Sequence, residues 1–172
     1  SITEFSGPAG RGYVSFLAEC TGWNISNYGV AGATMQIATD LPYWSTPEYR
    51  QAMESQPDVV YLMLGTNDAK VQNWHADRYG QDAAKMIGGF RDLPSSPQVY
   101  VMAPPPLFQD GYHKTSAQVI DEELSPLMKS ATVAVGQNVT FLDVVPRVFG
   151  GPNRTCRDCM YERGIFTESG DG

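Results

Sequence analysis

The chain has 172 residues, of which 42% are hydrophobic and 18% charged, a composition typical of one folded globular domain and not of a disordered chain. Its net charge of −7 and its lack of any basic run disfavour nucleic acid and anionic membrane surfaces as partners. No apolar run approaches the roughly 20 residues that a membrane span needs. We therefore expect a single domain over residues 1–172 with no membrane span.

The first part of the chain alternates between helical and extended patterns. Apolar residues recur at helical spacing over residues 13–20, and Gly22 follows as a stop, which predicts a helix. Residues 24–28 form a short extended run. A second helix is predicted from Pro47 to about Ser55, with Thr46 as its N-cap.

Three later segments have the composition of strands. Residues 58–64 (DVVYLML) and 98–103 (QVYVMA) are continuous apolar runs that turn-forming residues end, which is typical of strands buried on both faces. Residues 139–142 form a third, shorter strand. Each of these strands is expected to lie in a buried sheet.

Helical patterns separate these strands. Residues 79–90 carry an apolar stripe at helical spacing, and residues 119–135 carry another. Pro126 interrupts the second pattern, either as a kink or as the first residue of a new helix after Ser125. Strands that alternate with helices predict a parallel sheet with helices on both faces, a three-layer α/β/α sandwich of the flavodoxin-like kind. In such sheets ligands bind beyond the carboxyl ends of the strands.

Two short motifs follow predicted extended segments. Gly65-Thr66-Asn67-Asp68 comes directly after residues 58–64, so Asn67 would offer an amide donor at the edge of the sheet. In residues 27–34 (NYGVAGAT), Gly32 would present a backbone N–H that no side chain obstructs. Taken alone, each motif more often serves a turn or a helix cap than a catalytic site.

These two motifs belong to a series of four short sequence blocks that occur in a particular order along the chain. The chain opens Ser1-Ile2-Thr3, continues with residues 27–32 and 65–68, and closes Asp171-Gly172. These blocks resemble, in order, the GDSxT, NxGxxG, GxND and DGxH blocks of SGNH (GDSL-like) hydrolases, which are lipase-like acylhydrolases and esterases. The runs LGTNDAK and VMAPPPL resemble the branch that contains carbohydrate and small-ester O-acetylesterases.

The resemblance implies an α/β serine esterase that hydrolyses carboxylic esters, possibly O-acetyl groups on carbohydrate. Ser1 would be the nucleophile, and Asp171 would orient a histidine that takes the proton of the serine. The N–H of Gly32 and the amide of Asn67 would bind the oxyanion. The resemblance implies no metal and no organic cofactor, and a small-molecule or carbohydrate ester would be the partner.

The resemblance is incomplete at both ends of the chain. The family's histidine would fall two residues beyond Gly172, and the strand that precedes the serine in the family is absent before Ser1. We therefore expect a domain truncated at both terminal motifs and inactive as it stands. The sheet is expected to have an unpaired slot where its first strand belongs.

Other interpretations stay open. An N-terminal serine also suits the N-terminal nucleophile hydrolases, although those enzymes are built from antiparallel sheets. A non-catalytic ligand- or carbohydrate-binding module on the same fold would explain the missing histidine. His75 and His113 stand outside any DxxH motif, and each either packs structurally or lines a pocket. Gly7 to Gly12 is glycine-rich but matches no phosphate-binding motif, and it is interpreted as the loop that starts the first helix.

Several other residues bear on the cellular compartment and on the walls of a substrate pocket, and not on catalysis. Cys156 and Cys159 form a CxxC pair that is read as a short disulfide or as two free thiols. This pair and the three N-x-S/T sequons favour a secretory setting, since disulfides and glycans belong to that compartment. Candidates for aromatic walls of a substrate pocket, or equally for ordinary packing, are Tyr43, Trp44, Trp74 and Tyr112.

Overall fold

The computed structural model describes residues 13–107, 109–110 and 114–142. Ser1, Asp171, Cys156, Cys159, His113 and Tyr112 lie outside these ranges. The elements in chain order are α2 (Tyr13–Thr21), η2 (Tyr43–Ser45), α3 (Pro47–Glu54), β1 (Val59–Leu62), α4 (Ala76–Arg91), β2 (Gln98–Met102), η4 (Val119–Leu124), α5 (Ser125–Val135) and β3 (Val139–Leu142).

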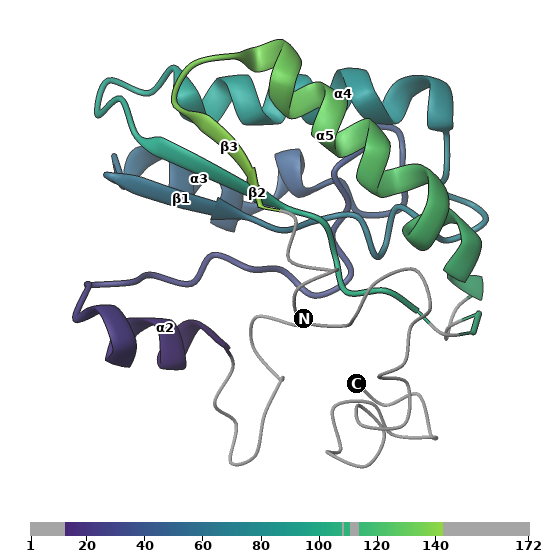
Figure 1. The fold of residues 1–172 in the computed structure, drawn as a ribbon, viewed down its shortest axis with the longest axis horizontal. Helices are drawn as coiled ribbons and strands as arrows, with labels where there is room; N and C mark the ends of the chain where they lie inside the picture. The colour runs from purple at the N-terminus through teal and green to yellow at the C-terminus, as the bar shows by residue number, and fades with distance from the viewer. Residues whose placement is uncertain (1–12, 108, 111–113, 143–172) are drawn as a thin grey trace.

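The sheet is parallel, as predicted. Its described strands lie in the order β1-β2-β3, with Val60 opposite Val99 and Val101 opposite Phe141. Figure 1 shows α4 and α5 together over one face of this sheet, while α2 lies on the opposite side. A parallel sheet flanked by helices confirms the predicted α/β fold class.

Helix α4 is the centre of the core because its apolar stripe meets the sheet. The predicted stripe residues are all buried: Tyr79, Ala83, Met86, Ile87 and Phe90. Helix α3 joins the same core, since the ring of Tyr49 packs edge-on against Phe90 with centroids 5.8 Å apart. Burying a side chain of this size contributes roughly 1.5–3 kcal/mol, so this stripe supplies much of the stability of the fold.

The local helix signals were read correctly. Thr46 caps α3 by accepting a hydrogen bond from the N–H of Tyr49 at 3.2 Å, and Pro47 occupies the first turn. Gly22 follows α2 with a φ of +69°, a conformation that glycine adopts without strain. Pro126 lies in the first turn of α5. The preceding η4 is a π-helix, so the helical path changes at Ser125, as the proline predicted.

The predicted burial of two strands on both faces is wrong. In β2 only Val99 and Val101 are fully buried, and the residues between them are half-buried. The rings of Tyr61 and Tyr100 stack on each other at 5.2 Å, with 17° between their planes. Both rings are half-buried.

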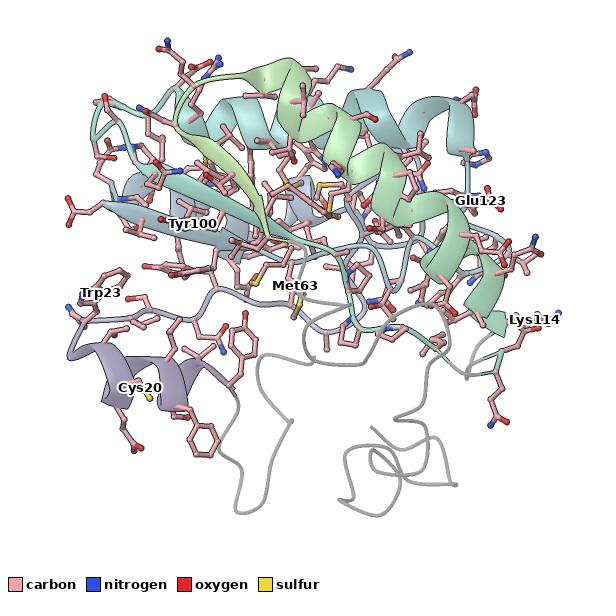
Figure 2. The ribbon with its side chains drawn as sticks, in the orientation of Figure 1. Cys20, Trp23, Met63, Tyr100, Lys114 and Glu123 are labelled. Atoms are coloured by element: carbon pink, nitrogen blue, oxygen red, sulfur yellow. The ribbon has the colours of Figure 1, made fainter. Side chains whose placement is uncertain are left out.

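The edge of the sheet at β1 borders a groove. Strand β1 pairs with β2 alone among the described strands, and the extended run 24–28 lies across the groove without joining the sheet. The groove encloses about 700 Å³, and its walls include Leu17, Tyr28 and Val60. Met63, just after β1, also lines it (Figure 2).

No helix in the described part of the chain is long and apolar enough to span a membrane.

Candidate functional site

The first part of the site is a tight turn at Gly32. The N–H of Ala33 donates to the carbonyl of Val30 at 3.3 Å, and Gly32 has a φ of +82°. These values fit a type II turn, whose third residue needs a positive φ and is therefore usually glycine. The N–H of Gly32 is not used by the turn and has no hydrogen-bond partner within the described ranges. It is thus a backbone donor held in a fixed turn.

The second part of the site is the turn that leaves β1 at Gly65. Gly65 has a φ of +132°, and its carbonyl accepts from the N–H of Ala69 at 3.1 Å. A Cβ at this position would lie 2.7 Å from Cδ1 of Leu124 and 3.3 Å from the hydroxyl oxygen of Tyr79. Both the backbone angle and the available space therefore require glycine here.

The two predicted oxyanion donors are brought together. Nδ2 of Asn67 donates to the carbonyl of Ala33 at 3.3 Å, and Ala33 is the neighbour of Gly32 in the chain. Asn67 is only partly buried, and its amide nitrogen carries a second N–H. The structure thus places a side-chain donor beside the turn that holds a backbone donor. Their catalytic roles remain predictions.

Asp68 holds the loop that follows Gly32. This side chain is fully buried, and its two oxygens accept from the N–H groups of Met35 and Gln36, each at 2.8 Å. Burial raises the pKa of Asp68 to about 6, and the hydrogen bonds from Met35 and Gln36 oppose this rise.

Asn73 ties the same two loops together a second time. Its Nδ2 donates to the carbonyl of Asn67 at 3.0 Å and to Oδ1 of Asp40 at 2.8 Å. Its own carbonyl accepts from Nε2 of Gln36 at 2.9 Å, and its side chain is buried. Lys70 lies 3.6 Å from Asp40 and helps to hold this corner. The sequence analysis did not identify this role of Asn73.

Three of the candidate wall aromatics serve the protein's own packing. The hydroxyl of Tyr43 donates to the carbonyl of Tyr28, and Nε1 of Trp44 donates to the carbonyl of Met35, each at 2.8 Å. Nε1 of Trp74 donates to Oε2 of Glu123 at 3.1 Å. Glu123 belongs to η4, at the right of Figure 2. Their polar atoms are already used, which favours the packing interpretation.

The remaining candidates contribute less. His75 precedes α4 as its N-cap residue, but its side chain makes no capping hydrogen bond. Within residues 13–107, 109–110 and 114–142, no cluster of His, Cys, Asp or Glu could hold a metal ion. Ser1 and Asp171, the predicted nucleophile and orienting carboxylate, fall outside these ranges, so the described part of the site is the pair of loops that carries Gly32 and Asn67.

Comparison with known proteins supplies the family. The chain is 29% identical over 136 residues to an acetylxylan esterase of Xylanibacter ruminicola (strain ATCC 19189 / DSM 19721 / CIP 105475 / JCM 8958 / 23). This alignment covers 69% of the chain but only 28% of the relative, so the chain spans little more than a quarter of that protein's length. No solved structure matches. The model of the GDSL-like lipase/acylhydrolase family matches residues 1–164, and the protein therefore belongs to that family.

Proposed function

We propose that this protein is a serine esterase that hydrolyses carboxylic esters. Its substrates would carry small acyl groups, such as O-acetyl groups on carbohydrate. The observation that carries the proposal is the hydrogen bond from Asn67 to Ala33, which ties the asparagine amide to the residue that follows Gly32. Two hydrogen-bond donors aimed at one point would stabilise the oxyanion of an ester-hydrolysis intermediate. The family match supports the same chemistry.

The proposed reaction has two acyl-transfer steps. The hydroxyl of Ser1 attacks the ester carbonyl while a histidine, which would follow Asp171, takes the serine proton and returns it to the departing alcohol. Water then attacks the acyl-serine ester by the reverse route and releases the acid. In both steps negative charge develops on the carbonyl oxygen, where the donors of Gly32 and Asn67 would stabilise it.

The substrate class rests on two lines of support. The matched relative carries the name acetylxylan esterase, which denotes removal of acetyl groups from a polysaccharide. The runs around Gly65 to Lys70 and Val101 to Leu107 also resemble the O-acetylesterase branch of the family. Acetylated sugars are therefore the substrates to assay first.

The decisive experiment treats the protein, with any residues that its gene encodes before Ser1 and after Gly172, with a fluorophosphonate probe. Labelling is expected in the wild type and should disappear in Ser1→Ala. Asn67→Ala should lower kcat for p-nitrophenyl acetate about 100- to 1000-fold, since one oxyanion donor is lost. Asn24→Ala, an exposed asparagine outside this turn, is the control. A folded wild type that does not label would overturn the proposal and favour a binding module.

A further inference from the structure

Asp68 is a buried acid whose presence stability alone does not explain. Its side chain is fully inaccessible, and no lysine or arginine of the described ranges forms an ion pair with it. Burial of an unpaired carboxylate is costly in free energy, and here it raises the pKa of the group. Its two oxygens offset part of this cost, because they accept the N–H groups of Met35 and Gln36.

We infer that Asp68 is a positioning residue for ester hydrolysis: its two oxygens hold the backbone of Met35 and Gln36, and this sets Gly32 against Asn67. The inference rests on the proposed function. It assigns to Asp68 no contact with substrate. Its effect passes through the short segment 32–36, which links the held amides to the turn at Gly32.

The lengths of the hydrogen bonds indicate that Asp68, more than Asn67, holds the segment 33–36 against the turn that follows β1. Asn67 donates one hydrogen bond to Ala33, and Asp68 accepts hydrogen bonds from the N–H groups of Met35 and Gln36. The Asn67 bond is neutral and measures 3.3 Å, whereas both Asp68 bonds measure 2.8 Å. Bonds to an ionised group are about twice as strong as neutral ones. Since Asp68 directly follows Asn67, it fixes the distance between the two donors from within the turn that carries one of them.

The two oxygens of the Asp68 carboxyl group accept both amides, which an asparagine side chain cannot do. An asparagine side chain has one acceptor oxygen, and its NH2 group would face the second N–H, donor against donor. The shape of the side chain is otherwise unchanged. Asp68→Asn therefore removes one of the two ties without creating a cavity, and it separates positioning from packing.

The kinetic experiment compares Asp68→Asn with the wild type on p-nitrophenyl acetate. We expect kcat to fall 10- to 100-fold with KM changed less than threefold, because the donors act on the transition state and not on the bound ester. Asp82→Asn is the matched control. Asp82 is also a buried acid that accepts a backbone N–H of this loop, that of Ile37 at 3.0 Å, but it does so beyond residues 32–36. Its variant should change kcat less than threefold, and a loss equal to that of Asp68→Asn would overturn the inference.

A second measurement does not depend on activity. Amide hydrogen exchange followed by NMR should be at least tenfold faster at Met35 and Gln36 in Asp68→Asn, while Val101 in the sheet keeps its protection. Unchanged exchange at the two amides would overturn the inference, and so would faster exchange with an unaltered kcat. If Asp68→Asn does not fold, Asp68→Ser is measured in the same way. A wild type without esterase activity would overturn the proposed function and the catalytic role of Asp68 together, and faster exchange would then show the loop tie by itself.

Discussion

Gly65→Ala should be among the most destabilising single substitutions at the site. The φ of +132° is one that side chains with a Cβ rarely adopt, which costs about 1–3 kcal/mol. The new methyl group would also lie 2.7 Å from Cδ1 and 3.0 Å from Cδ2 of Leu124, which is fully buried and cannot easily move. Overpacking of this kind costs about 1–3 kcal/mol. Together these effects should lower the free energy of unfolding by about 4 kcal/mol, a large share of the roughly 5–15 kcal/mol of a typical domain.

The assay is urea unfolding followed by tryptophan fluorescence, with linear extrapolation to water. Gly80→Ala is the matched control, because a Cβ at Gly80 on α4 meets no atom within 4 Å. This control should stabilise the protein by about 0.5–1 kcal/mol through helix propensity. Repeating Gly65→Ala in a Leu124→Ala background separates the clash from the backbone strain, since the clash contribution should vanish there. A loss below about 1 kcal/mol for Gly65→Ala alone would refute the reasoning.

Two further predictions concern the loops around the site. Asn73→Ala should lower the free energy of unfolding by about 2–3 kcal/mol, because it removes two donated hydrogen bonds and the one that Oδ1 accepts from the N–H of Asp40. The exposed control Gln72→Ala, unfolded in the same urea series, should stay within about 0.5 kcal/mol of wild type. The free energy of unfolding should also fall as the pH rises from about 4 to about 6. The pKa of Asp68 is about 6 in the folded protein, against an ordinary value of 3.8. Over this range folded Asp68 therefore keeps a proton that the unfolded chain has released. The loss is on the order of 3 kcal/mol, and Asp68→Asn should lack it; equal pH slopes in wild type and variant would contradict this.

The elements that the sequence predicted well depend on local signals. Thr46 caps α3, the stripe of α4 is buried, and β3 covers its predicted residues, because each is governed by neighbours within a few positions. The nearness of the Gly32 turn to Asn67 was expected from the family resemblance, and not from strand order, because the run 24–28 before Gly32 does not join the sheet.

The parts that were not predicted depend on distant partners. Asp68 bonds residues 32 and 33 positions away, and nothing in the run GTND indicates which amides its carboxylate reaches. Asn73 is similar, with a partner at Asp40. The burial of β1 and β2 was overestimated because large side chains such as Tyr61 and Tyr100 make a strand look apolar on both faces. How deeply the second face is covered depends on tertiary packing, which the sequence of the strand alone does not indicate.

The hydrogen bonds of Asp68 also indicate the order in which secondary structure and activity are regained during folding. Helices such as α4 form from contacts within a few residues, on a timescale of microseconds or less. The spacing between Gly32 and Asn67, in contrast, exists only after two segments more than thirty positions apart have closed on each other, which requires a long loop to be ordered first. During refolding, helical content should therefore be regained before the donor pair is assembled. Recovery of ester hydrolysis would then report completed tertiary structure, not secondary structure.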